Sequence, residues 1–127
     1  MYWLLKTEPS EYAFEDLVRE KTTFWEGVTN PTAVKHLRSM KSGDRIVVYH
    51  TGSVRAAVGT ARVVSVDAKD PKVPRVDIAA EAPLKAPVTL ETIKASSAFR
   101  GSPLLSMGRL SVVPLTAAQH RFLTTVR

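Results

Sequence analysis

The residues best suited to chemistry in this chain lie close together in the segment WEGVTN. Trp25 supplies a flat aromatic face, and we predict that it lies with Gly27 and Val28 in a short loop. Asn30 and Pro31 then begin a helix, because an Asn side chain caps first-turn N–H groups and Pro is favoured at the first helical position. A π-face beside a positively poled helix N-terminus can hold a flat polar ligand next to a phosphate. The alternative is that Trp25 is a hydrophobic staple over the core.

Several catalytic and metal-binding patterns are missing from the sequence. It contains no GxxxxGK[ST] phosphate loop, no GxGxxG after a strand and no GxSxG nucleophile elbow. It has no cysteine, which excludes disulfides, thiolate nucleophiles, Cys-ligated zinc and the zinc deaminase pattern. His36, His50 and His120 lack the spacing of metal ligands. We therefore expect a binding module without metal or cofactor rather than an enzyme.

Two alternatives to that expectation stay open. His50 alternates with Val48 in a predicted strand, which favours a hydrogen-bonded core histidine over a catalytic one. An enzyme that acts on a nucleotide could nevertheless use His50 or Glu8 as a general base. The other alternative is a module for a small molecule or a protein, on which the basic surface is incidental.

The charge of the chain is positive overall and unevenly spread. The formal net charge is +6 among 127 residues. Residues 8–26 are mainly acidic, residues 33–66 are basic apart from Asp44, and no acid follows residue 91. A basic surface suits a polyanion, because neutralised phosphates release condensed counterions. The charge pattern favours a nucleic-acid partner over a merely solvated basic surface.

Composition and length indicate one globular domain covering residues 1–127. Hydrophobic residues make up 44% and charged residues 24% of the chain, which is ordinary for a globular protein. No apolar run approaches the roughly eighteen residues that span a bilayer. Glu8 and the lack of a basic n-region argue against a signal peptide. We expect a cytoplasmic, intracellular protein with no membrane partner.

Hydrophobic periodicity and turn residues predict five strands and four helices. The strands are expected at residues 2–6, 45–51, 56–66, 75–80 and 110–113. The helices are expected at 11–20 after a Ser10 cap, from 31 to a stop at Gly43, at 89–95, and after a Thr116 capping box. This order indicates an α+β fold, a small mixed sheet or barrel with flanking helices.

The inner faces and irregular segments follow from the same pattern. We expect Pro83 and Pro87 to bracket a loop or edge segment, and residues 98–108 to be irregular. The apolar side chains expected on the inner faces of helices are Phe14, Leu17 and Val18, then Ala33, Leu37 and Met40, and finally Phe122, Leu123 and Val126.

Seven short strings, in order along the chain, together resemble the EVE domain family. They are WLLKTEPS (3–10), WEGVxN (25–30), AxxxLRxMxxGD (33–44), YH (49–50), GxAxV (59–63), PVTLxxIK (87–94) and RLSVxP (109–114). The resemblance implies a PUA-like fold, a small mixed β-barrel with flanking helices, similar to YTH and ASCH domains. It also implies a non-enzymatic module that recognises a modified base, chiefly a modified cytosine such as 5-methylcytosine in DNA, by flipping it into an aromatic pocket. DNA is favoured over RNA.

The energetics of base flipping agree with these residue types. Extruding a base costs a few kcal/mol, and one stacking contact returns roughly 1–3 kcal/mol. Phosphate contacts from basic side chains must supply the rest. By position in the motifs, the expected nucleic-acid-binding residues are Lys6, Glu8, Ser10, Trp25, Val28, Asn30, Lys35, Arg38, Tyr49, His50, Arg109 and Ser111.

The resemblance gives some of these residues expected roles. Trp25 would be the stacking wall, and Glu8 would accept from an exocyclic amine or be a surface acid beside a turn. Asn30 would cap its helix, with a contact to the base edge as the weaker alternative. Arg109 would meet phosphate at the mouth of a basic groove, and Tyr49 would line the pocket or belong to the core.

Three positions depart from the family pattern. Thr29, Val34 and Ser106 stand where members of the family often carry a basic residue. These differences bear on how tightly the nucleic-acid backbone is held. Lys35 and Arg38 are expected to compensate, together with Arg100 in the irregular segment.

Overall fold

One six-stranded sheet forms the centre of the protein, in a computed structural model that describes residues 1–125. The order across the sheet is β2-β5-β4-β3-β1-β6. Strands β1 and β3 are parallel, and every other pair of neighbouring strands is antiparallel. The strands are β1 (Tyr2–Thr7), β2 (Thr22–Trp25), β3 (Arg45–His50), β4 (Ala56–Asp67), β5 (Arg75–Thr89) and β6 (Val112–Leu115).

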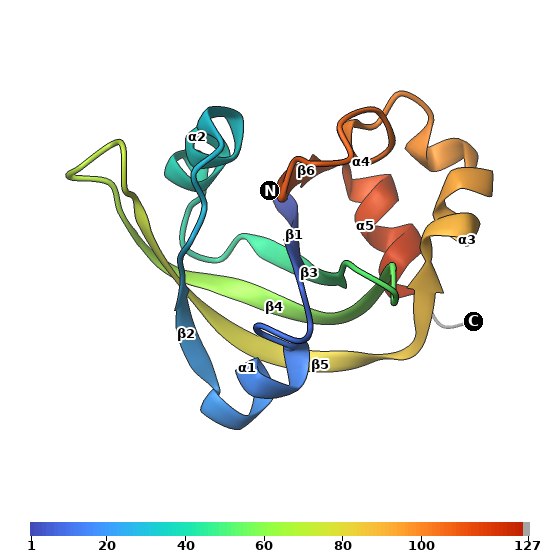
Figure 1. Ribbon diagram of the computed structural model, residues 1–127, viewed down its shortest axis with the longest axis horizontal. Helices are drawn as coiled ribbons and strands as arrows, with labels where there is room; N and C mark the ends of the chain where they lie inside the picture. Colours follow the sequence, from blue (N-terminus) through green and yellow to red (C-terminus); the bar gives the residue numbers. More distant parts are fainter. Residues whose placement is uncertain (126–127) are drawn as a thin grey trace.

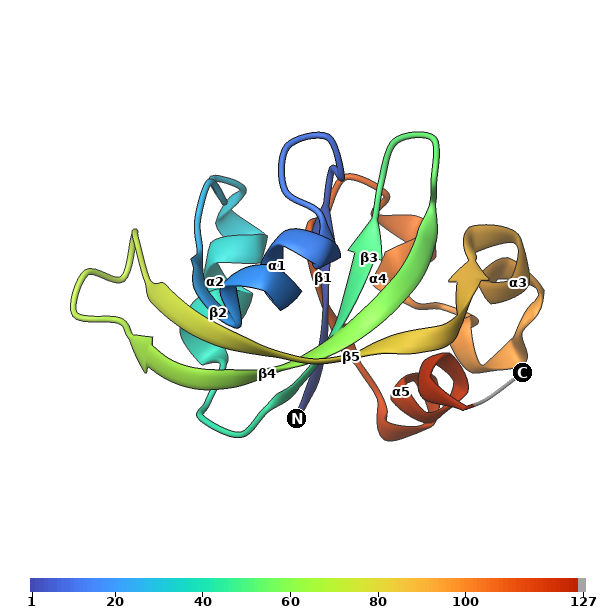
Figure 2. The same ribbon diagram turned by 90° about the horizontal axis from the view of Figure 1, so that it is seen from below.

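The sheet curls into a partial barrel with helices around it (Figures 1 and 2). The helices are α1 (Phe14–Glu20), α2 (Pro31–Ser39), α3 (Leu90–Ala95), η1 (Ser97–Phe99), α4 (Pro103–Ser106) and α5 (Ala117–Thr124). Helix α2 contacts β6 at one end of the strand order and β5 near the other, so it helps to close the barrel. The predicted α+β class with a mixed sheet is confirmed. Among residues 1–125, none of the helices is long and apolar enough to cross a membrane.

The core lies inside this curl and on both faces of its central strands. Leu4, Leu5, Ile46 and Val47 are fully buried, and Val48 nearly so. Strand β3 is therefore covered on both faces. A run of branched residues suits a strand packed from two sides.

Local capping chemistry follows the predictions closely. The Asn30 side chain accepts from the N–H groups of Thr32 (2.9 Å) and Ala33 (3.1 Å), with Pro31 at the first helical position. Thr116 forms the expected capping box at the start of α5. These contacts join residues two or three positions apart, which is why sequence alone identifies them.

The first helix is shorter than predicted, and its cap is a different residue. It begins at Phe14, and the Ser10 prediction is wrong because Ser10 donates to the Glu8 carboxylate instead. Ala13 occupies the N-cap position, where its N–H donates to the Asp16 side chain (2.8 Å). Val18 is 48% exposed, so the expectation that it faces inward is also wrong.

Two further predictions around the second helix are wrong. Trp25 is the last residue of β2 rather than part of a loop, and it is paired with Val76 of β5. Helix α2 ends at Ser39, ahead of Gly43, which occupies a turn with φ +90°. The Asp44 carboxylate accepts from the Lys41 N–H (3.0 Å) and ties that turn.

The C-terminal half differs from the predictions in extent. Strand β5 continues to Thr89 and contains both prolines, and because β2 pairs only as far as Ala79, Pro83 and Pro87 lie in an edge segment as expected. The segment predicted to be irregular contains η1 and α4, and the last strand is shifted to Val112–Leu115. The prediction for Val126 lies outside the described residues.

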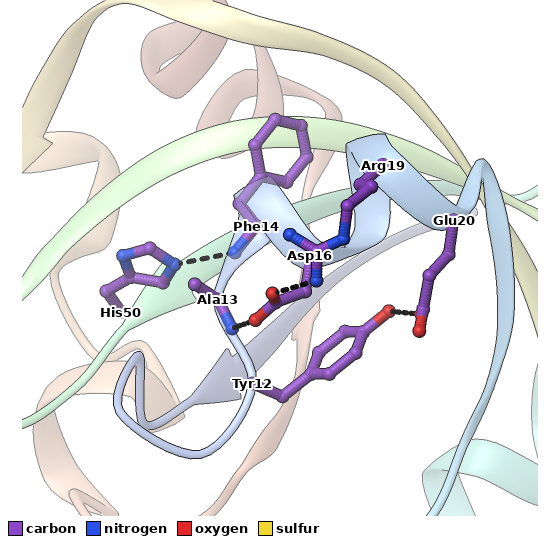
Figure 3. Close-up of polar contacts among 7 residues, drawn as sticks. All are labelled: Tyr12, Ala13, Phe14, Asp16, Arg19, Glu20 and His50. Carbon is purple, nitrogen blue, oxygen red and sulfur yellow. Dashed lines mark hydrogen bonds and ion pairs between the residues drawn. The ribbon is translucent and has the colours of Figure 1, made fainter.

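The start of α1 is anchored on the sheet through Phe14. Its N–H donates to His50 Nε2 of β3 (3.0 Å), as Figure 3 shows, so that nitrogen is unprotonated. Its ring packs on Gly59 of β4, where an added Cβ would lie under 3.0 Å from three ring atoms. The hydrogen bond predicted for His50 is confirmed, but the side chain is only partly buried and does not belong to the core.

We expect Gly59→Ala to destabilise the protein by about 1–3 kcal/mol, since the added methyl overpacks against the Phe14 ring. Urea unfolding followed by circular dichroism measures this effect. Gly108→Ala is the matched control, because a Cβ there meets no atom within 4 Å. Equal stability of the two variants would contradict the packing argument.

Stability should fall as the pH drops from 7.5 to 5.5, and His50→Gln should reduce that fall. Burial lowers the pKa of His50 in spite of the nearby carboxylates of Glu15 and Glu8. A lowered pKa means that the neutral imidazole stabilises the fold fully above about pH 6.5, and that this contribution is lost as the pH falls. The Gln side chain can accept the same hydrogen bond without titrating.

Urea unfolding of both proteins at the two pH values measures the effect. His36 and His120 also have pKa values lowered by burial, so the variant should keep part of the pH dependence. An unchanged pH dependence in His50→Gln would show that this hydrogen bond does not couple folding to protonation.

Candidate functional site

A cavity of about 380 Å³ opens where β1 ends, between the first loop and strand β2. This volume is at the lower end of the range found for small-molecule sites, about 300–1,000 Å³. Its lining residues come from β1, the segment before α1, β2 with the following loop, and the segment before β6. They are Lys6, Thr7, Glu8, Glu11, Tyr12, Thr23, Phe24, Trp25, Glu26, Gly27, Val28 and Ser111. We call it the aromatic cavity.

Three aromatic side chains line this cavity. The ring of Tyr12 stands edge-on to that of Trp25, with the centroids 6.1 Å apart and the planes at 85°. Trp25 is only 8% exposed, so it borders the cavity with a small part of its surface and packs into the core with the rest. Phe24 is 42% exposed, and the Arg75 guanidinium lies 4.5 Å from its centroid. Trp25 therefore packs in the core, as the alternative interpretation expected, and its role as a stacking wall stays a prediction.

The Tyr12 phenol is protonated at neutral pH. Its hydroxyl donates to the Glu20 carboxylate (2.5 Å), as Figure 3 shows. Burial and this hydrogen bond raise the pKa of Tyr12 to about 12. The ring therefore stays neutral, and its position is fixed by a contact to α1.

Carboxylates outnumber cations in the aromatic cavity. Among residues 1–125, Glu8, Glu11 and Glu26 line it together with a single cation, Lys6. The Ser10 hydroxyl and N–H donate to Glu8, and these hydrogen bonds lower the pKa of its carboxyl. Glu8 is therefore an ionised acceptor at neutral pH. The lining suits a ligand with N–H donors better than it suits a phosphate.

Lys6 also lines a second cavity, of about 310 Å³, which lies on the other side of the end of β1. Its ammonium donates to the Gly108 carbonyl (2.9 Å) and lies 5.9 Å from the centroid of the Tyr49 ring. Burial lowers the pKa of Lys6 and raises that of Tyr49. The second cavity is lined by Lys6, Tyr49, Thr51, Gly52, Arg55, Leu90, Lys94, Leu104, Leu105 and Gly108.

The structure brings five of the twelve predicted residues together in the aromatic cavity, namely Lys6, Glu8, Trp25, Val28 and Ser111. Tyr49 lines the second cavity instead. Ser10 and Asn30 line neither cavity, and each makes the local hydrogen bonds described above. The predicted cap role of Asn30 is confirmed, and its amide oxygen is occupied.

The other predicted residues lie outside both cavities. His50 accepts from Phe14 beneath the first loop. Lys35 and Arg38 are exposed on α2, where Arg38 donates to the Pro71 carbonyl (2.8 Å). Arg109 is exposed. In the sequence it follows Gly108, which lines the second cavity, and precedes Ser111, which lines the aromatic cavity. Their expected contacts to nucleic acid stay predictions.

Sequence reasoning missed Tyr12 and Phe24 as cavity residues. Tyr12 was assigned to the helix predicted at residues 11–20. In the structure it lies before α1, in a turn where the N–H groups of Glu11 and Tyr12 donate to the Glu8 carbonyl. The short alternation Thr-Thr-Phe-Trp after residue 21 is the signal that could have indicated β2.

The positions that depart from the family pattern have different surroundings. Thr29 and Ser106 are exposed, whereas Val34 is 8% exposed and packs within α2. Only the first two therefore change the accessible surface. Among residues 1–125, no group of three or more His, Asp or Glu side chains could hold a metal ion.

Comparisons with known proteins place the chain in a family. Residues 1–126 match the EVE domain. Thymocyte nuclear protein 1 from Gallus gallus is 30% identical over 164 aligned positions, covering 98% of this chain and 68% of that protein.

Two solved structures have the same fold. Rpa0253 from Rhodopseudomonas palustris has a TM-score of 0.88 at 35% identity, covering 97% of this chain and 90% of that one. Human THYN1, solved in complex with DNA containing 5-methylcytosine, has a TM-score of 0.80 at 27% identity, with 98% and 95% covered. The match over residues 1–126 shows that this chain belongs to the EVE domain family.

Proposed function

We propose that this protein is a non-enzymatic reader of DNA, acting inside the cell, that takes one modified cytosine out of the stack and into the aromatic cavity. The observation that carries the proposal is the cavity itself, in which Tyr12, Phe24 and Trp25 stand beside hydrogen-bonding side chains. A flipped base needs a π-face to stack on and polar groups along its edge.

The charge of the lining supports a base with an amino group. Cytosine presents an N4 amino donor, and an ionised carboxylate accepts such a donor. Glu8 is kept ionised by its own hydrogen bonds, and Glu11 and Glu26 add acceptors. Thymine carries a carbonyl oxygen in place of the amino group, so its hydrogen-bond acceptor would face the carboxylate acceptors of the cavity.

The relatives support DNA as the polymer. Human THYN1 forms a complex with DNA containing 5-methylcytosine, and the present chain covers 95% of that structure. The net charge of +6 suits either nucleic acid, so this complex is the reason to favour DNA over RNA.

The two candidate general bases are poorly suited to catalysis. His50 Nε2 is occupied by the Phe14 N–H, and His50 lines neither cavity. Glu8 has a lowered pKa, which makes it a weak base near neutral pH. We therefore favour binding without turnover.

The test is a titration of fluorescent DNA duplexes that differ only in one 5-methylcytosine, followed by mass spectrometry of the recovered DNA. We expect tighter binding of the modified duplex and unchanged DNA. Equal binding of the two duplexes would contradict base reading, and a converted base would favour the enzyme hypothesis.

We expect Trp25→Leu to weaken binding of the modified duplex by roughly 5- to 150-fold, which corresponds to one stacking contact of about 1–3 kcal/mol. Leu keeps an apolar side chain in the core, whereas Ala at this buried position would cost about 3–5 kcal/mol of stability. The measurement is the same titration, with circular dichroism to confirm folding.

Trp25→Phe is the matched control, because it retains an aromatic face at the end of β2. It should keep more of the discrimination between modified and unmodified DNA than the Leu variant does. Indistinguishable binding by the wild type and Trp25→Leu would rule out Trp25 as the stacking wall.

We expect Arg109→Ala to weaken binding to every duplex and to reduce the slope of log affinity against log salt by about one. Arg109 is exposed, and no hydrogen bond or ion pair holds its guanidinium within residues 1–125. Arg121→Ala, on α5, removes the same charge as a control. A slope equal to that of the control would contradict a phosphate contact at Arg109.

A further inference from the structure

The second cavity has the opposite charge to the aromatic cavity. Lys6, Arg55 and Lys94 line it, and no carboxylate among residues 1–125 does. Its remaining surface is apolar or small, with Leu90, Leu104 and the Tyr49 ring among the lining residues. Three cations around an apolar floor suit a phosphate group attached to a less polar body, such as a sugar.

Two of these cations are free to bind a ligand. Within residues 1–125, neither Arg55 nor Lys94 has a hydrogen bond or ion pair from its side chain, and both are exposed. Lys6 uses one of its three N–H donors on the Gly108 carbonyl. The cavity therefore offers unpaired positive charge from three separate elements.

The elements that carry the exposed cations are joined to each other. The Leu90 N–H at the start of α3 donates to the Arg55 carbonyl (2.9 Å) in the β3–β4 turn. Arg55 itself has φ +47°, a backbone conformation that is uncommon outside glycine. Strained backbone of this kind is found at binding sites, where surrounding structure holds it in place.

The two cavities share a common wall. Lys6 lines both of them. Glu8 lines the aromatic cavity and Gly52 the second, and a Cβ at Gly52 would lie 2.7 Å from Glu8 Oε1. The contact of Glu8 with Gly52 therefore lies on the boundary between the two cavities.

We propose that the second cavity binds the DNA backbone phosphate next to the flipped nucleotide, with the attached sugar over the apolar floor. This inference rests on the proposed function, because it takes the flipped base to be in the aromatic cavity. The division of charge supports it: carboxylates repel a phosphate from one cavity, and Lys6, Arg55 and Lys94 attract it to the other.

The test removes the two exposed cations together, as Arg55→Gln with Lys94→Gln. Gln retains a long polar side chain, and at residue 55 it keeps a side chain on the strained backbone. The control double variant, Lys85→Gln with Arg121→Gln, removes one Lys and one Arg that line neither cavity; Lys85 lines a separate cavity with His120, the residue before Arg121. Binding of the modified duplex and its unmodified twin is measured over a series of salt concentrations.

The Arg55/Lys94 variant should reduce the salt slope by about 0.9, because the proposed site neutralises one backbone phosphate and each neutralised phosphate on duplex DNA contributes about 0.9. It should lower affinity for both duplexes by the same factor and leave their ratio unchanged. Lys94→Gln alone should lower the affinity for both duplexes by the same factor and reduce the slope by less than the double variant does, which serves as the test if circular dichroism shows that the double variant is unfolded.

A slope equal to that of the control double variant would overturn the proposal, and so would a changed ratio with an unchanged slope. If the wild type binds both duplexes equally while the slope still falls in the Arg55/Lys94 variant, base reading fails and the phosphate site stands. If the wild type binds neither duplex at low salt, both proposals fail.

Discussion

The parallel pairing of β1 with β3 is the constraint on which both cavities depend. Its register sets Lys6 opposite Tyr49 and Thr7 opposite His50. Since parallel strands end at the same edge, the segments that leave them emerge side by side, and Glu8 lies against Gly52. Ligand sites of open sheets with parallel strands form at this edge for the same reason. The first loop then builds the aromatic cavity, and the β3–β4 turn builds one side of the second.

The loop that follows β1 keeps its shape because α1 is locked to the sheet. The Phe14 N–H donates to His50 of β3, and the Phe14 ring packs on Gly59 of β4. Any shift of α1 along the sheet would break both contacts. Tyr12 is tied to Glu20 at the far end of the same helix. The aromatic wall is therefore supported from outside the cavity, so a ligand would find the rings already placed and would lose less conformational freedom on binding.

Sequence reasoning identified the features that depend on near neighbours. The Asn30 cap and the Thr116 box join residues within one helical turn, so their chemistry is visible in the sequence. Trp25 was assigned to a loop because β2 is only four residues long and its partner, β5, lies far along the chain. Lys94 could not be grouped with Lys6 before the topology was known, because only the fold brings α3 to the end of β1.

The burial of Trp25 decides how a base could be held. A ring that is 8% exposed offers little area for full face-to-face stacking, so Tyr12 and Phe24 must share the contact. Several partial contacts of roughly 1–3 kcal/mol or less, together with phosphate binding, can offset an extrusion cost of a few kcal/mol. Stacking on the small exposed part of the Trp25 indole alone could not offset this cost. In the binding mode proposed above, the cationic second cavity supplies part of this phosphate contribution.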